Sequence, residues 1–140
     1  MRVLAVDPGK RRLGIAISDP TGTIANPLTV IEHVKRAIDA AGIAQLAAEH
    51  NARLIVVGQS LDFDGKPTFE GRQAARLAAA IRTQTNLPVE LWDEGFSTQT
   101  AISAREALGS PRHKRTGHLD DLAATVILQT YLNAHPQPEE

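Results

Sequence analysis

Residues 2–18 read RVLAVDPGKRRLGIAIS, which is two short apolar runs joined by a polar turn. The runs at 2–7 and 13–18 mix Val, Ile or Leu with small residues, and Pro8 and Gly9 lie between them. Apolar runs of this length that end at turn residues predict strands, and the short connection predicts an antiparallel pair. A weaker run at 23–31 follows a second turn, so the first part of the chain is expected to form a three-stranded meander.

The rest of the sequence alternates helical and strand-like segments. Helices are expected at 35–50, 68–85, 97–108 and 119–134, and buried strands at 54–57 and 88–92. The buried side chains of the first helix are expected to be Val34, Ile38 and Ala41, with a second set at Ile43, Leu46 and Ala47. This order predicts an α/β fold of the ribonuclease-H-like type. Its mixed five-stranded sheet is expected to have three antiparallel strands followed by two parallel ones, with helices on both faces. We expect a single domain at 1–135 and a flexible tail at 136–140.

Composition excludes several classes of protein. With 42% hydrophobic and 22% charged residues, the 140-residue chain is neither disordered nor fibrous. It has no cysteine, which excludes disulfides, thiolate zinc sites and a cysteine nucleophile. No apolar run approaches the roughly 20 residues of a membrane span, and no leader is recognisable, so a cytoplasmic protein is expected. The net charge of −1 does not indicate a polyanionic partner, but basic residues cluster at 10–12 and 112–115.

Acidic residues lie at the ends of three predicted elements. Asp7 closes the first strand, Asp93 and Glu94 close the last strand, and Asp120 and Asp121 begin the last helix. Carboxylates that converge from separate segments repel one another unless a cation lies between them, and oxygen ligands suit hard divalent ions such as Mg²⁺ or Mn²⁺. Two such ions roughly 3.5–4 Å apart can stabilise the attacking and leaving oxygens of a phosphodiester. Helix capping also explains acidic residues at such positions, so the prediction depends on their convergence.

For only one of the two acidic pairs do the residues alone decide which member is expected to face the site. At about 100° per residue, Asp120 is expected on the flank of the apolar stripe of the last helix and Asp121 toward solvent. The residues taken for that stripe are Leu119, Leu122, Ala123, Val126, Ile127 and Thr130. Successive side chains of a strand point to opposite faces, so only one of Asp93 and Glu94 can face the site, and the residues alone leave that choice open.

Four motifs, in this order, resemble those of the YqgF/RuvX family. They are DPGKRRLGIAISD at 7–19, the stretch from 56–58 through 64–65, Asp93-Glu94 with Ser97-Thr98, and DDLAA at 120–124 with further matches at 127–129 and 131–132. The resemblance covers nearly the whole chain. It implies a ribonuclease-H-like fold related to the RuvC resolvase, in a family described both as a Holliday junction resolvase and as the nuclease that matures the 5′ end of pre-16S ribosomal RNA.

The same resemblance assigns roles to residues. It maps Asp7, Glu94 and Asp120 onto the acidic triad that binds the metal and catalyses hydrolysis, which selects Glu94 over Asp93. It implies a phosphodiester hydrolase that uses one or two Mg²⁺ or Mn²⁺ ions. Two positions depart from the family pattern. Ser60 stands where a Gly-x-Pro motif has proline, and Gly95 stands where an Asp-Glu-Arg motif has arginine, which puts substrate contacts near Gly95 in question.

Nucleic acid is the expected partner. The backbone at Gly9 is expected either to approach the ligand or simply to form a turn. Phosphate contacts, which do not read sequence, are expected from Arg11, Arg12 and a basic loop that contains Arg112, Lys114 and Arg115.

Three alternatives to rRNA processing remain from the sequence. A junction resolvase acting on branched or single-stranded DNA in recombination and repair would have to cut two strands symmetrically, and would therefore be a homodimer. A non-catalytic ribosome-assembly module would bind nucleic acid without cutting it. An ATPase of the actin and sugar-kinase type would need a second domain, which 140 residues do not supply.

Overall fold

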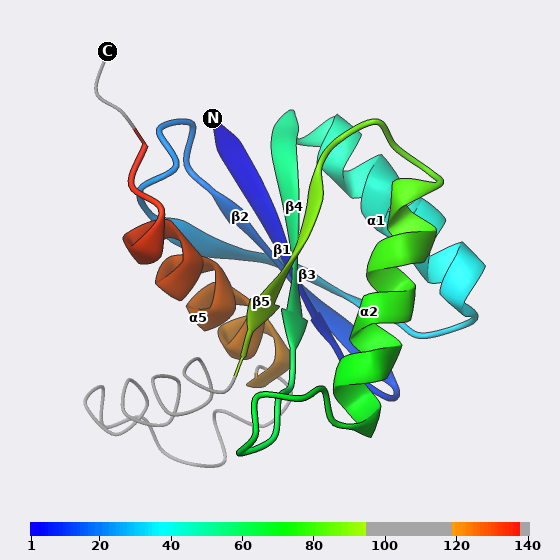
Figure 1. The fold of residues 1–140 in the computed structure, drawn as a ribbon. Coiled ribbons are helices and arrows are strands. Elements are labelled where there is room, and N and C mark those ends of the chain that lie inside the picture. The colour runs from blue at the N-terminus through cyan, green and yellow to red at the C-terminus, as the bar shows by residue number, and fades with distance from the viewer. Residues whose placement is uncertain (95–118, 138–140) are drawn as a thin grey trace.

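Five strands form one mixed sheet in the order β3-β2-β1-β4-β5 (Figure 1). The computed structural model describes residues 1–94 and 119–137, and it gives no side chains for 119–121. The strands are β1 (Arg2–Pro8), β2 (Arg12–Ser18), β3 (Ala25–Glu32), β4 (Ala52–Gln59) and β5 (Val89–Asp93). The pairs β1–β2 and β2–β3 are antiparallel, and β1–β4 and β4–β5 are parallel, which confirms the predicted sheet.

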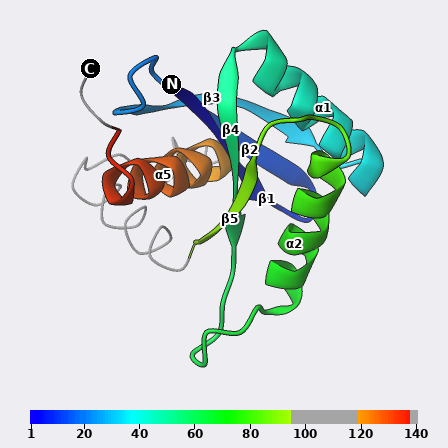
Figure 2. The ribbon, with the colours of Figure 1, turned by 45° about the horizontal axis from the view of Figure 1, so that its top comes forward.

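Helices cover both faces of this sheet, as predicted. Helices α1 (Arg36–Glu49) and α2 (Phe69–Arg82) pack on one face, and α5 (Leu119–Ala134) packs on the other (Figure 2). Alternate side chains of β1 and β4 therefore enter two separate cores, and this explains why both strands are almost continuously apolar. The helix expected at 97–108 lies outside the described residues.

The expected apolar face of α1 is partly wrong. Val34 and Ile38 are 58% and 53% exposed, and Ala41 is also exposed. The buried residues of the helix are Asp39, Ala40, Ile43 and Ala47. Asp39 can be buried because its Oδ1 accepts a hydrogen bond of 3.0 Å from the Val34 N–H and its Oδ2 bonds to His33. Asp39 therefore lies, with its carboxylate hydrogen-bonded, on the same buried face as Ala40, Ile43 and Ala47.

Helix α2 follows its prediction closely. The Thr68 side chain caps it by accepting a hydrogen bond of 3.1 Å from the Gly71 N–H. Its buried residues are Gly71, Ala74, Leu77, Ala78 and Ile81, which follow helical spacing.

The buried stripe of α5 differs from the expected one. Leu122, Ala123 and Thr130 are only half-buried, whereas the helix packs on the sheet through Ala124, Ile127, Leu128, Tyr131 and Leu132. The half-buried Thr130 accepts a hydrogen bond of 3.0 Å from the Trp92 indole N–H at the edge of the sheet, which explains why it is not in the core.

The end of the chain contacts its beginning. The Gln137 side chain accepts a hydrogen bond of 2.7 Å from the Met1 amino group and donates one of 3.1 Å to the Met1 carbonyl oxygen. The domain boundary at 135 and the flexible tail remain predictions. In the described part of the chain, no helix is both long and apolar enough to cross a membrane.

Candidate active site

The carboxyl ends of the three parallel strands meet at one edge of the sheet. In the register of the sheet, Val6 of β1 lies beside Val57 of β4, and Gly58 lies beside Trp92 of β5. Glu94 directly follows β5, and its N–H donates a hydrogen bond of 3.0 Å to the Gln59 carbonyl oxygen. Asp7 and Glu94, which are 87 positions apart in the sequence, are therefore brought to the same edge.

Strand alternation places the two acidic side chains on the same face. Asp7 alternates with Val6, which packs beneath α1 and α2, so Asp7 belongs to the α5 face with Ala5. Glu94 shares the α5 face with Trp92, and Asp93 shares the α2 face with Leu91. This alternation places Glu94, and not Asp93, on the same face as Asp7.

The Asp7 and Glu94 carboxyl groups interact directly. Burial is the largest cause of a raised Glu94 pKa, and together with the Asp7 charge and a side-chain hydrogen bond to Asp7 it brings this pKa to about 7. The charges of Asp93 and Glu70 add smaller contributions. A hydrogen bond between two carboxyl groups requires the pair to hold a proton, and the raised Glu94 pKa agrees with a proton shared in this pair. Two carboxylates that share one proton form a centre that favours added positive charge.

Gly58 makes room for the Glu94 side chain. A Cβ on Gly58 would lie 2.8 Å from Glu94 Oε2 and 2.7 Å from Ile127 Cδ1. Both contacts are far shorter than van der Waals separation, and Gly58 is buried. The Glu94 carboxyl group and the Ile127 side chain therefore occupy the space that a side chain at position 58 would need.

Replacing Gly58 with alanine is expected to displace Glu94 or Ile127. We expect a loss of about 1–3 kcal/mol in the free energy of unfolding, measured by denaturant titration, with cleavage at least about 10-fold slower. Gly42→Ala is the matched control. A Cβ on Gly42 meets nothing within 4 Å, so this change inside α1 is expected to stabilise the protein by up to about 1 kcal/mol. Unchanged stability and activity in Gly58→Ala would contradict the described packing.

The Glu94 pKa predicts a dependence of stability on pH. The pKa rises from an ordinary value of 4.5 in the unfolded chain to about 7 in the folded protein, so the folded state binds more protons between these values. Stability of the metal-free protein is therefore expected to fall, by on the order of 2 kcal/mol, as the pH rises from about 5 to 8. Thermal unfolding in EDTA measures this slope, and Glu94→Gln is expected to flatten it. An equal slope in both proteins would rule out Glu94 as its source.

The third expected acidic residue lies at the start of α5. The backbone of Asp120 is in the first turn of this helix, and its side chain is outside the described part. Position 120 is one helical turn before Ala124, which is buried against the sheet. Among the side chains that are described, there is no group of three or more His, Asp or Glu placed to hold a metal ion. The described site thus contains two of the three expected ligands.

The other predicted contact residues are only partly described. Gly9, Arg11 and Arg12 are exposed around the turn between β1 and β2. A Cβ on Gly9 would lie 2.3 Å from the Arg12 carbonyl oxygen, so the turn itself requires glycine, whatever a ligand does there. The basic loop with Arg112, Lys114 and Arg115 lies outside the described residues, as does Gly95.

Sequence reasoning missed two features of this region. The expected strand ends at Val57, whereas Gly58 is the penultimate residue of β4, where a side chain would collide with Glu94. A glycine at the end of an apolar run is a usual sign of close backbone approach and is the signal that would have found it. Asp39 was overlooked because an acidic residue in the first turn of a helix normally interacts with the helix dipole in solvent.

The arrangement defines an enzyme-like centre on a ribonuclease-H-like domain, with two acidic side chains at the carboxyl edge of a mixed sheet. The family RuvX, described as Holliday junction resolvase, matches residues 1–134. A protein of Syntrophus aciditrophicus (strain SB) named "Putative pre-16S rRNA nuclease" is 35% identical over 137 residues, with 98% of this chain and 91% of that protein covered. A protein of the same name from Anaeromyxobacter sp. (strain Fw109-5) is 38% identical over 133 residues, with 95% and 97% covered.

A solved structure has the same fold. The structure of T. thermophilus RuvC in complex with Holliday junction substrate matches with a TM-score of 0.58 and 15% identity, and the match covers 97% of this chain and 96% of that chain. The chain belongs to the RuvX family. Membership of this family makes it a nuclease, a hydrolase that acts on ester bonds of nucleic acid.

Proposed function

We propose that this protein hydrolyses phosphodiester bonds with one or two divalent ions, Mg²⁺ or Mn²⁺, held by Asp7, Glu94 and Asp120. The observation that carries the proposal is the pairing of the Asp7 and Glu94 carboxyl groups on one face of the sheet. An all-carboxylate donor set fits hard divalent cations. The raised Glu94 pKa also fits, because positive charge between the two groups would take the place of the shared proton.

Each part of this chain then has a defined task. When bound, the ions would activate a water and neutralise charge that develops on the phosphate. Asp7 and Glu94 would hold the ions at the carboxyl edge of the sheet. We place Asp120 opposite them because α5 begins on the same face. The exposed Arg11 and Arg12 would hold neighbouring phosphates and leave the base sequence unread. We assign the same task to Arg112, Lys114 and Arg115.

The substrate that we propose is the 5′ region of the precursor of 16S ribosomal RNA, in the cytoplasm. Support comes from the relatives of about 35% identity that carry this substrate in their names. Holliday junction resolution is the second candidate because the family description names it. A resolvase must place two centres symmetrically on a junction and would therefore act as a two-fold homodimer.

One assay separates these functions. The protein is incubated with a precursor rRNA fragment, a four-way DNA junction and single-stranded DNA, each with Mg²⁺, Mn²⁺ or EDTA. We expect cleavage of the rRNA fragment near the mature 5′ end with either ion and none in EDTA. Symmetric cutting of the junction by a dimer, without rRNA cleavage, would select the resolvase. Binding without cleavage of any substrate would contradict the catalytic proposal and favour an assembly module.

A further inference from the structure

A cavity of about 650 Å³ opens on the opposite face of the sheet from the acidic pair. It lies between the turn that follows β1 and the first turns of α1 and α2. Its size is in the range of pockets that bind small organic ligands. The described residues that give it chemical character are Lys10, Leu13, Lys35, Arg36, Phe69 and Gln73.

The cavity combines an apolar lining with an exposed aromatic ring. Leu13 and Leu77, both part of the core, contribute the apolar surface. Phe69 is 59% exposed although it lines the cavity, and the Arg72 guanidinium lies 5.9 Å from its ring centroid. An aromatic ring that remains in water beside a cavity is available to stack on a planar ligand.

Cationic side chains line the same cavity. Lys10, Lys35 and Arg36 are exposed, and Glu70 is the acidic residue that faces them from α2. Asp39 also lines the cavity, but its carboxylate is occupied by the Val34 N–H and by His33. Lys10, Lys35 and Arg36 thus outnumber the two acidic residues of the lining, and this favours a ligand that carries phosphate.

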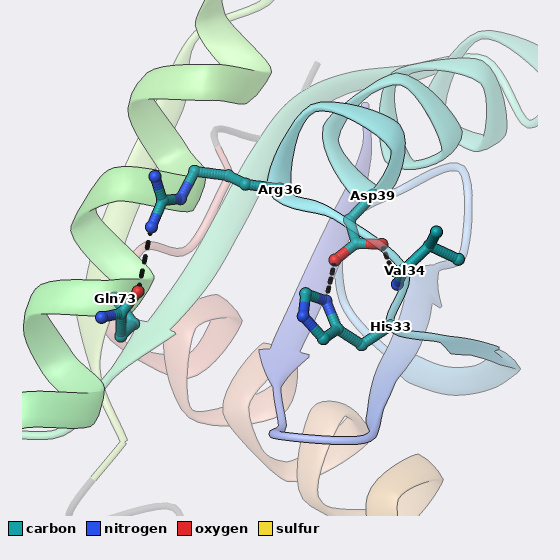
Figure 3. Close-up of polar contacts among 5 residues, drawn as sticks. All are labelled: His33, Val34, Arg36, Asp39 and Gln73. Atoms are coloured by element: carbon teal, nitrogen blue, oxygen red, sulfur yellow. Dashed lines mark hydrogen bonds and ion pairs between the residues drawn. The ribbon is translucent and has the colours of Figure 1, made fainter.

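Two of the polar side chains are held in position. Arg36 of α1 donates a hydrogen bond of 3.0 Å to Gln73 Oε1 of α2, which leaves the Gln73 amide N–H groups as donors for a ligand (Figure 3). His33 is fixed through Nδ1 by the buried Asp39, so Nε2 is the ring nitrogen that a ligand can reach (Figure 3). Side chains fixed in this way lose little freedom when a ligand binds.

The cavity begins next to the edge of the sheet at which the acidic pair lies. Pro8 and Gly9, which line it, directly follow Asp7, and two consecutive residues span at most about 7 Å. A nucleic-acid strand whose phosphodiester lies at Asp7 and Glu94 can therefore pass over the carboxyl edge of β1 and place a neighbouring nucleotide in the cavity.

We propose that this cavity binds one nucleotide of the substrate strand, with the base against Phe69 and the phosphate at Lys35 and Arg36. Gln73 and His33 would then contact the edge of the base. The proposal rests on the nuclease function above and deepens it, because it adds a subsite beside the cleaved bond. The same chemistry would bind a free mononucleotide, so the test distinguishes the two sources.

Binding is measured without cleavage, so that the result does not depend on the catalytic assignment. Fluorescence anisotropy of a labelled single-stranded RNA in EDTA compares variants in the cavity with matched controls. Phe69→Ala is expected to weaken binding by about 10-fold, and Lys35→Gln to reduce the salt dependence, the slope of log K against log[salt], by about 0.7. Phe63→Ala, on an exposed aromatic outside the cavity, and Arg53→Gln, at the opposite end of β4, are the controls.

Equal effects of Phe69→Ala and Phe63→Ala, or of Lys35→Gln and Arg53→Gln, would overturn the subsite. In a second experiment, changes in the amide chemical shifts of the protein are followed while the RNA, a mononucleotide or inorganic phosphate is added. Shifts around Lys35 and Gln73 with the RNA support the proposal, and similar shifts with the mononucleotide mean that free nucleotides enter as well. Shifts with inorganic phosphate alone would overturn it. If the protein cleaves RNA but the cavity variants bind RNA as tightly as the parent, only this inference is contradicted. If the cavity binds RNA but the protein never cleaves it, only the nuclease function is contradicted.

Discussion

Replacing Asp7 with asparagine is expected to lower the rate of metal-dependent cleavage by at least about 1000-fold while the fold remains intact. The amide is nearly isosteric but carries no charge, so it cannot hold a divalent ion with Glu94. Removal of the Asp7 charge also relieves one cause of the raised Glu94 pKa, so the metal-free variant is expected to be at least as stable as the parent.

Single-turnover cleavage with Mn²⁺ and thermal unfolding in EDTA measure the two effects of Asp7→Asn. Asp64→Asn is the matched control because this carboxylate is exposed on the loop after β4, and its cleavage rate is expected to be unchanged. Cleavage by Asp7→Asn at the parent rate would show that the acidic pair is not the catalytic centre.

The second large effect distinguishes two neighbouring carboxylates. Glu94→Gln is expected to lower cleavage by a similar factor of about 1000, whereas Asp93→Asn is expected to change it by less than about 10-fold. The reason is strand alternation: Glu94 lies on the α5 face with Asp7, and Asp93 lies on the α2 face.

Stability provides an independent readout of the same pair of variants. Glu94→Gln is expected to stabilise the metal-free protein at pH 8, since it removes a buried carboxylate whose ionisation is unfavourable there. If Asp93→Asn abolishes cleavage and Glu94→Gln does not, the assignment of faces at the end of β5 is wrong.

Local patterns predicted the elements of this fold well. The apolar runs around Pro8 and Gly9 correspond to β1 and β2, and Thr68 begins α2 as its capping chemistry indicates. The mixture of antiparallel and parallel strands was also predicted, because short connections favour antiparallel neighbours and helical connections produce parallel strands. These features depend on interactions between residues close in sequence.

Features that depend on distant residues were not predictable in the same way. The buried face of α1 includes Asp39, whose hydrogen bonds to His33 and Val34 no hydrophobic periodicity shows. The faces of Asp93 and Glu94, which the resemblance but not the residues alone had distinguished, depend on the register of β5 on β4. The role of Gly58 depends on the position of Ile127 on α5. In each case tertiary packing, rather than local propensity, decides the outcome.

Binding of Mn²⁺, followed by the electron paramagnetic resonance signal of the free ion, tests the central claim most directly. The account predicts saturable binding of one or two ions by the parent protein and by Asp64→Asn. It predicts affinity at least about 10-fold weaker in Asp7→Asn, Glu94→Gln and Asp120→Asn. Equal Mn²⁺ binding by the parent and all three of these variants would contradict a metal centre built from Asp7, Glu94 and Asp120.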